Sequence, residues 1–150
     1  PVIPLKYRIF LWLAFWGRLN TRDNMVKKQW SSIATNACCD ICPAIESISH
    51  LALRCICAPA VWERFDLLDA AYNSVDLLDF VQRAHLRWHA SHKLHILVVA
   101  GLFTLWHARN DRVFNHKRWS PLYTRMYAAQ LLSLWSHRAW RPGDKTTILS

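Results

Sequence analysis

The chain has 150 residues, of which 53% are hydrophobic and only 3 are glycine. A chain of this length and composition can bury an apolar core, which excludes an intrinsically disordered protein. Its formal net charge of +9, from 19 Lys and Arg against 10 Asp and Glu, favours a polyanionic partner. The longest apolar run, residues 96–106, is too short to span a bilayer and predicts a buried helix, so we expect no membrane partner.

The first predicted helix begins near residue 5. Its large apolar residues recur at spacings of three and four and form one stripe: Leu5, Ile9, Trp12, Leu13 and Trp16. Lys6 and Arg8 fall off that stripe. We expect the tryptophans at such spacings to pack in the core, namely Trp12, Trp16, Trp62, Trp88, Trp106 and Trp135.

Helical patterns continue along the rest of the chain. Thr21 is the predicted N-cap of a short helix over residues 22–29, and another helix is expected to begin near Ser47 and to end or unwind before Cys55. The remaining helices are expected over residues 59–68, with Pro59 in the first turn, and over 75–86, 92–114 and 121–140. Strand alternation is nowhere sustained, so the predicted fold is all-α, a small helical bundle.

Three thiols and one imidazole lie within seventeen residues, as Cys39-x2-Cys42-x7-His50-x4-Cys55. Cys and His in this number suit tetrahedral Zn²⁺, and four protein ligands leave no coordination position for a substrate. The spacing therefore predicts one structural Cys3His zinc knuckle in the N-terminal third of the chain.

Other interpretations of these cysteines stay open. A Cys-x2-Cys pair also fits a redox dithiol, and buried free cysteines often pack like small hydrophobic residues. Cys38 or Cys57 could replace a neighbour in the ligand set, although Cys39 has the two-residue spacing to Cys42 that makes a tight knuckle. His50 and Cys55 are separated by about 500° around an ideal α-helix and would not share one of its faces.

The segments around these ligands carry a family resemblance. In order along the chain they are Pro4-Leu5-Lys6-Tyr7-Arg8-Ile9-Phe10-Leu11-Trp12, Gly17-Arg18-Leu19-Asn20-Thr21, Cys39-x2-Cys42, Glu46-Ser47-x2-His50-Leu51, Cys55 and Trp62. This arrangement resembles the zinc-binding domain of reverse transcriptases from plant non-LTR (LINE-type) retrotransposons over about residues 4–65. Residues 105–114 resemble the W-x-x-R-N-x-x-V-F segment that follows it in the same polyproteins. Pro43, where the family often has Gly, and the extra thiol of Cys38 depart from the pattern.

The resemblance implies a zinc-binding module over residues 1–70 and a helical extension over 71–150 packed on it, or one compact unit comprising both. It also implies adjacent polyprotein domains as partners. Five cysteines, an odd number spaced for metal, fit an intracellular reducing compartment better than a disulfide scaffold. The sequence leaves nucleus and cytoplasm equally open.

A cluster of basic residues precedes the ligands and ends in an aromatic residue: Lys6, Arg8, Arg18, Arg22, Lys27, Lys28 and Trp30. Such residues can neutralise phosphates and stack on an unpaired base, which predicts non-specific binding of RNA or DNA through the backbone. The alternative is that the charges are ordinary solvated residues and that Trp30 closes the core.

No enzymatic site is predicted. His85, His89, His92 and His95 recur at helical spacings, but no acidic or thiol partner converges on them. The chain also lacks an adjacent pair of aspartates, a Walker-type loop and a nucleophile elbow. The rival to nucleic-acid binding is a structural or protein-interaction module that braces neighbouring domains, and a decayed genomic fragment without a selected role is a third possibility.

Overall fold

The computed structural model describes residues 3–30, 36–88 and 91–139. The helices in these ranges are α1 (Leu5–Phe15), α2 (Arg22–Lys27), η1 (His50–Arg54), α3 (Pro59–Arg64), α4 (Leu68–Asn73), α5 (Leu77–Trp88), α6 (Ser91–Asn115) and α7 (Pro121–Ala139). The described residues contain no β-strand beyond one isolated bridge between Cys38 and Ile45, which confirms the all-α prediction. None of the described helices combines the length and apolarity that crossing a membrane requires.

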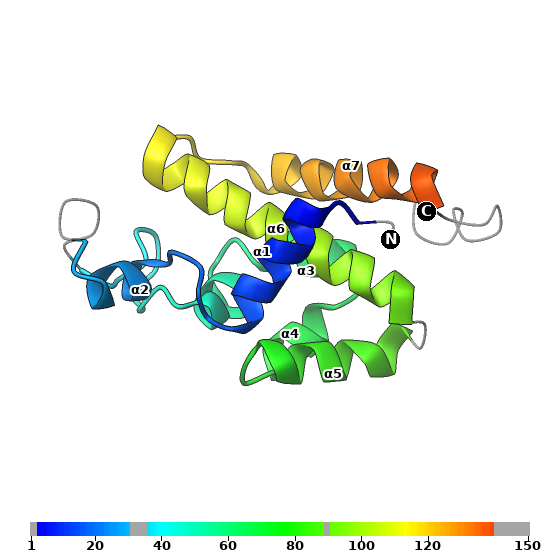
Figure 1. Ribbon diagram of the computed structural model, residues 1–150, viewed down its shortest axis with the longest axis horizontal. Coiled ribbons are helices and arrows are strands. Elements are labelled where there is room, and N and C mark those ends of the chain that lie inside the picture. Colours follow the sequence, from blue (N-terminus) through cyan, green and yellow to red (C-terminus); the bar gives the residue numbers. More distant parts are fainter. Residues whose placement is uncertain (1–2, 31–35, 89–90, 140–150) are drawn as a thin grey trace.

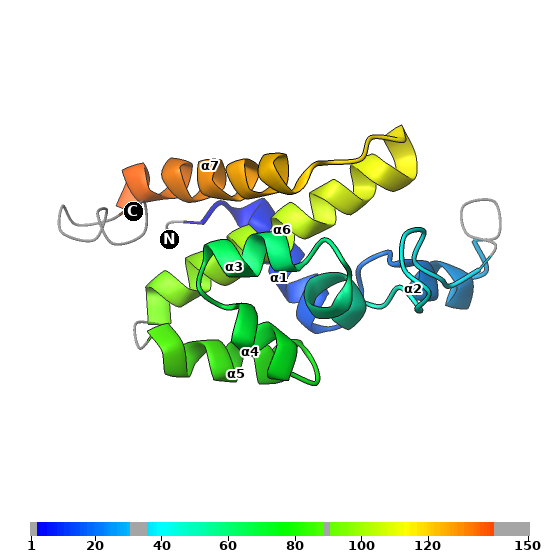
Figure 2. The same ribbon diagram turned by 180° about the vertical axis from the view of Figure 1, so that it is seen from behind.

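Helix α6 is the central element of the fold. Helix α1 crosses it on one side, α7 runs alongside it, and α3 lies on the opposite side (Figures 1 and 2). Helix α5 and the turn η1 also contact α6. The segment predicted as a buried helix forms the middle of α6, and its buried residues include Ile96, Leu97, Val99, Ala100, Leu102 and Leu105. Burial on several sides explains why this helix is apolar around most of its circumference.

A glycine allows α3 to approach α6 closely. The indole of Trp62 is fully buried and donates a hydrogen bond of 2.6 Å to the carbonyl of Ala52. A Cβ at Gly101 would lie 2.4 Å from this indole, well inside van der Waals contact. The missing side chain of Gly101 therefore creates the space into which Trp62 packs.

The predicted core stripe of α1 is wrong except at Leu13, which is half-buried and packs against the core. Tyr7, Phe10 and Ala14 are the buried residues of this helix, and the residues that face solvent are Leu5, Ile9, Trp12, Phe15 and Trp16. Because α1 is apolar nearly all round, its periodicity does not select one face. Its aromatic partners determine which face is buried. The ring of Tyr7 packs edge-on against Phe103 and Trp135, with ring centroids 4.7 Å and 4.9 Å apart.

Several helix boundaries also differ from those predicted. The expected helix over residues 59–68 is broken between α3 and α4, where Asp66 has a φ of 57° that an α-helix cannot continue through. Helix α2 ends at Lys27, before Gln29 with a φ of 60°. Trp62 and Trp135 are core residues as predicted, while Trp88 and Trp106 are half-buried. The expected end of the last helix, Trp140, lies outside the described residues.

Candidate metal centre

A narrow loop positions the first two candidate ligands. The backbone N–H of Cys39 donates to the carbonyl of Ala44 at 2.8 Å, and that of Glu46 donates to Ala37 at 2.8 Å. These bonds close a hairpin-like loop around the Cys39–Cys42 segment. A further short contact, from Ala44 N–H to the carbonyl of Cys42 at 2.8 Å, tightens its tip. The loop therefore forms the knuckle that the Cys-x2-Cys spacing predicts.

A turn of π-helix positions the other two. The backbone N–H of Cys55 donates to the carbonyl of His50 at 2.7 Å, so the turn η1 is closed by a bond between residues five apart. The helical segment ends at Arg54, as expected, with Cys55 in an extended conformation. On an ideal α-helix, His50 and Cys55 would lie on different faces. The wider turn removes that obstacle, and both residues reach the same site.

The four side chains converge. The potential ligand atoms of Cys39, Cys42, His50 and Cys55 all lie within 4.8 Å of one another. The sulfurs of Cys42 and Cys55 are 3.8 Å apart. Two sulfurs bound at about 2.3 Å to a tetrahedral zinc would be separated by about 3.8 Å, so this spacing fits the metal. The two cysteines are not joined by a disulfide in this structure, since such a bond is about 2.05 Å long.

The imidazole of His50 supplies an independent indication. Its Nε2 atom is buried and has no hydrogen-bond partner among the described residues. A buried nitrogen without a partner is costly, whereas a bound cation would satisfy it. Burial also lowers the pKa of His50, which favours the neutral imidazole that ligates metals. The donor set and the unpartnered nitrogen both fit Zn²⁺.

The surroundings of Cys39 and Cys55 disfavour their thiolate forms when no cation is bound. Burial raises the pKa of Cys39 to about 11. The pKa of Cys55 is also raised, first by its hydrogen bond with Cys57 and then by burial. Three thiolates in such a buried cluster would repel one another, so only a cation can stabilise them together. The site can thus hold a soft divalent metal, and four protein ligands leave it suited to a structural role.

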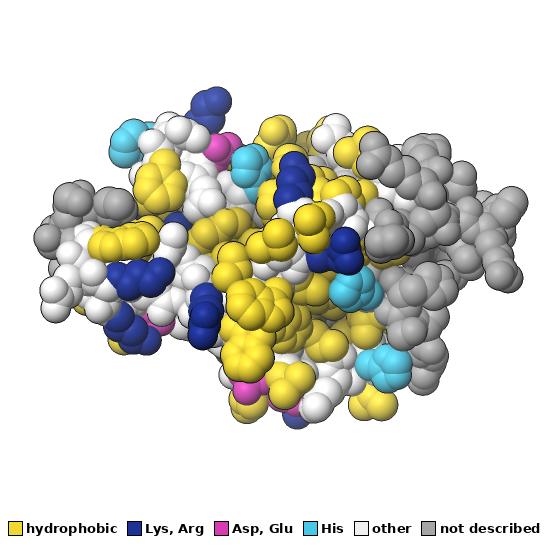
Figure 3. Space-filling view, in the orientation of Figure 1, with side chains coloured by type: hydrophobic (Ala, Val, Ile, Leu, Met, Phe, Trp, Pro, Cys, Tyr) yellow, Lys and Arg dark blue, Asp and Glu magenta, His cyan; other side chains and the backbone are white. Residues whose placement is uncertain are grey.

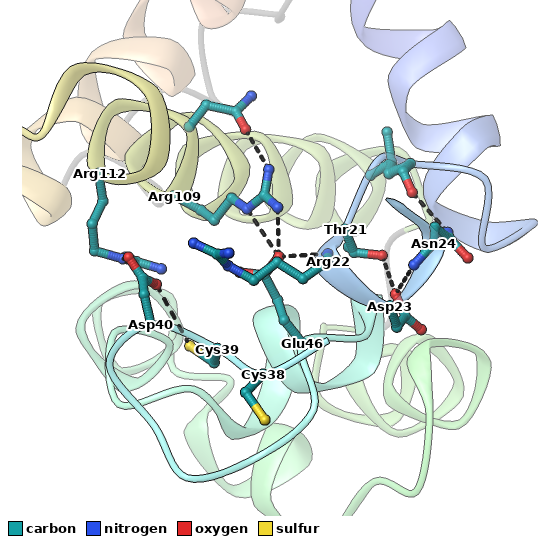
Figure 4. A network of polar contacts seen from close by, with 12 residues as sticks. Thr21, Arg22, Asp23, Asn24, Cys38, Cys39, Asp40, Glu46, Arg109 and Arg112 are labelled. Carbon is teal, nitrogen blue, oxygen red and sulfur yellow. Dashed lines mark hydrogen bonds and ion pairs between the residues drawn. The ribbon is translucent and has the colours of Figure 1, made fainter. Parts of the chain in front are cut away.

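The two remaining thiols lie outside this cluster. Cys38 is exposed, and its thiol points away from that of Cys39 (Figure 4). Cys57 is half-buried, and the hydrogen bond with Cys55 lowers its pKa to about 7. Neither belongs to the group of four whose ligand atoms converge. The structure therefore favours Cys39 over Cys38 at the first position, in agreement with the two-residue spacing to Cys42.

Two arginines of α6 hold the loop against the bundle (Figure 4). Arg112 Nε donates to Asp40 Oδ1 at 2.9 Å, and Asp40 lies between Cys39 and Cys42 in the chain. Arg109 donates to Glu46 at the end of the same loop. Cys39, Asp40 and Glu46 also lie within 4.8 Å of one another, but both carboxylates are already paired with arginine, which makes this the weaker metal group.

The role of these arginines was not predicted from the sequence. Arg109 and Glu46 each occur in a segment that resembles the retrotransposon family, but nothing in their spacing shows that they pair. The sequence signal is weak, because Arg109 directly follows the largely apolar stretch of residues 96–108 but precedes the polar residues Asn110 and Asp111. Charged residues are seldom buried unless they are paired, so a partner could have been sought among the acidic residues of the earlier segments.

Some of the predicted nucleic-acid-binding residues are exposed, and others already contact side chains of this chain. Lys6, Arg8 and Arg18 are exposed. Lys28 Nζ donates to Asn20 at 2.8 Å and lies 4.8 Å from the ring centroid of Trp30, which is 40% exposed and does not close the core.

Lys27 has an acidic neighbour, and Arg22 is partly buried. Lys27 is 3.7 Å from Asp23, although its side chain remains well exposed. Arg22 is half-buried, and its Nε atom is buried without a hydrogen-bond partner in the described structure. Arg22 is thus the member of the set least suited to contact a phosphate at the surface.

The predicted histidine cluster is described only in part. His89 lies outside the described residues, and the side chain of His92 is likewise not described. His85 and His95 line one groove together, but they belong to neither metal-ligand group found in the described part of the chain. Both of those groups include Cys39, and neither extends to α5 or α6.

The fold and the converging ligands define a helical domain with a Cys3His cluster of the kind that binds structural zinc. Residues 1–62 match the family model described as zinc-binding in reverse transcriptase. This segment contains all four converging residues and ends at Trp62, so the N-terminal part of the chain is similar to an accessory zinc-binding domain and not to a catalytic one. Neither curated proteins nor solved structures give a significant match.

Proposed function

We propose that Cys39, Cys42, His50 and Cys55 bind one structural Zn²⁺ and that the chain is an accessory domain of a plant LINE-type reverse transcriptase. The convergence of the four ligand atoms carries this proposal, together with the match of residues 1–62 to the family. The metal would cross-link the loop that carries Cys39 and Cys42 to the turn η1. The protein's own residues bring the donors together, and α6 holds the loop in place through Arg109 and Arg112.

We further propose that the domain binds RNA or DNA non-specifically through backbone phosphates. The support is electrostatic, because the first 22 residues contain four basic and no acidic residues and the chain carries a net charge of +9. Lys28 beside Trp30 combines a cation with an exposed ring, an arrangement that suits a phosphate next to an unpaired base.

Elemental analysis tests the metal. We expect about one zinc per chain, removable by a chelator with loss of structure in the N-terminal third. Purified protein without zinc, in which Cys39 and Cys42 are alkylated as rapidly as in denaturant, would contradict the metal site.

Salt dependence tests the nucleic-acid interface. In the variant Arg18→Gln, Lys27→Gln, Lys28→Gln, we expect weaker binding to unrelated RNA and DNA oligonucleotides. The salt slope should flatten by roughly 0.7–0.9 for each phosphate that the variant no longer neutralises. The matched control removes three exposed arginines from the acidic middle of the chain, Arg64→Gln, Arg83→Gln, Arg87→Gln, and should leave the slope unchanged. If both variants weaken binding equally, the interaction depends on the net charge of the chain and not on a particular surface.

A further inference from the structure

The outer face of α1 is an apolar surface that no element of the described residues covers. Its residues follow helical spacings of four, three and four, and their exposed fractions are 61% for Leu5, 50% for Ile9, 53% for Trp12 and 66% for Trp16. In Figure 3 hydrophobic side chains form a continuous band over this part of the molecule. Apolar residues scattered singly over a surface are ordinary, but a contiguous band of this kind marks an interaction site.

A groove continues this face on one side. It has a volume of about 180 Å³ and lies between α1, α5 and α6, with Leu11, Phe15, Val81, Leu94 and Val98 supplying most of its lining. Phe15 is 39% exposed and belongs to both the groove and α1. The surface thus consists of a ridge next to a hollow large enough for one or two apolar side chains.

Basic residues border the ridge. Lys6, Arg8 and Arg18 are exposed, and the guanidinium of Arg18 lies 5.9 Å from the ring centroid of Trp12. The first acidic residue of the chain is Asp23, so no acid from the first 22 positions balances them. An apolar strip with a cationic border is complementary to an apolar strip with an anionic border.

We propose that this surface docks an acidic amphipathic helix of a protein partner. The ridge from Leu5 to Trp16 is about 18 Å long at 1.5 Å per residue, which matches roughly three turns of a partner helix. One apolar side chain of that helix would enter the groove at Phe15, and acidic residues on its flanks would face Lys6, Arg8 and Arg18. Nucleic acid fits less well, because the aliphatic Leu5 and Ile9 provide no ring on which a base can stack.

This surface is separate from the metal cluster and from Lys28 and Trp30. Its basic border shares Arg18 with the proposed nucleic-acid interface, but the apolar ridge does not, so the test is designed around the ridge. The test uses a fluorescently labelled, amphipathic helical peptide of about four turns with leucines on one face and glutamates on both flanks. Its control peptide carries lysines in place of the glutamates. Fluorescence anisotropy with the full chain measures the affinity of each.

The protein variant is Ile9→Gln, Trp12→Gln, Trp16→Gln, which removes three exposed side chains from α1 and its C-cap. The matched control is Leu122→Gln, Met126→Gln, Leu134→Gln, which removes three from α7 with exposed fractions of 61%, 53% and 60%. Because both sets are exposed, circular dichroism and urea midpoints should stay close to those of the parent protein. A further variant, Lys6→Glu, Arg8→Glu, tests the charged border.

We expect the acidic peptide to bind saturably and the α1 variant to bind it about tenfold or more weakly, as for truncation of interface anchors. The control on α7 should bind within about twofold of the parent, and the charge reversal should shift preference to the lysine peptide. The proposal is overturned if the acidic peptide does not bind, if the lysine peptide binds as tightly, or if the α1 variant binds unchanged. Sedimentation showing a dimer that the α1 variant abolishes would assign the face to a second copy. If oligouridylate displaces the peptide, and the α1 variant no longer binds oligouridylate, the face would be assigned to nucleic acid.

Discussion

Arg109 and Glu46 form a buried ion pair, although 63 residues separate them in the chain. Arg109 Nη2 lies 2.5 Å and Nε 3.0 Å from Glu46 Oε1, and neither side chain is more than 1% exposed. The same oxygen accepts the backbone N–H of Arg22 at 2.9 Å. One carboxylate therefore joins α6, the start of α2 and the loop that carries Cys39 and Cys42.

Removing one member of this pair should destabilise the fold strongly. We expect Arg109→Met to lower the free energy of unfolding by about 3–5 kcal/mol, because it leaves the Glu46 carboxylate buried without its cation. The double variant Glu46→Leu, Arg109→Met should lose less than the sum of the single losses. Urea denaturation measures all of these values.

The exposed pair of Arg83 with Asp79 provides the control, at 3.1 Å on α5. Arg83→Gln should cost less than about 1 kcal/mol, as expected for an exposed ion pair. A similar cost for Arg109→Met would show that the Arg109–Glu46 contact does not hold the loop to α6.

Gly101→Ala should destabilise the protein despite the better helix propensity of alanine. Alanine gains about 1 kcal/mol in a helix, whereas forcing a methyl group against the buried indole of Trp62 costs about 1–3 kcal/mol. Since the added Cβ would lie 2.4 Å from that ring, we expect the packing cost to dominate. Adding Trp62→Leu to the glycine variant should remove part of the clash, so the two substitutions should be less than additive. Stabilisation by Gly101→Ala alone would contradict the close packing of α3 on α6.

Serine substitutions should separate the metal ligands from the neighbouring thiols. Cys55→Ser is expected to release zinc and loosen the loop, because it removes one of four ligands and folding depends on the bound metal. Cys38→Ser should retain about one zinc per chain, since Cys38 is exposed and outside the converging group. Cys57→Ser is also expected to retain it. Elemental analysis of the three proteins after gel filtration gives the answer, and loss of zinc from Cys38→Ser would mean that the ligand set has been assigned wrongly.

Zinc affinity should fall as the pH is lowered from neutral toward 5. The three thiols must lose protons to bind, and burial raises the pKa of Cys39 to about 11 in the metal-free site, so protons compete effectively with the metal. Zinc should therefore bind more weakly as the pH falls, and the cysteines should take up protons when the zinc is released. A competition titration with a chromophoric chelator at several pH values measures this dependence. Affinity that stayed constant over the range would exclude thiolate ligation.

Local sequence was sufficient to predict the helical class and the candidate ligands. Helix α6 was recognised because the apolar run of residues 96–106 is too short to span a bilayer and is typical of a buried helix. Cys39, Cys42, His50 and Cys55 were recognised because all four lie within seventeen residues, so their spacing alone restricts how far apart they can be. The two-residue gap also selected Cys39 over Cys38.

Tertiary packing decided the features that local sequence left open. Helix α1 is apolar on nearly every side. Its Tyr7 and Phe10 face inward, where they pack against aromatic rings of α6 and α7, while Trp12 and Trp16 face solvent. The pairing of Glu46 with Arg109 joins segments far apart in the chain, and no periodicity records such a contact. A helical pattern specifies which residues share a face, but which face is buried depends on the surfaces that the rest of the chain brings against it.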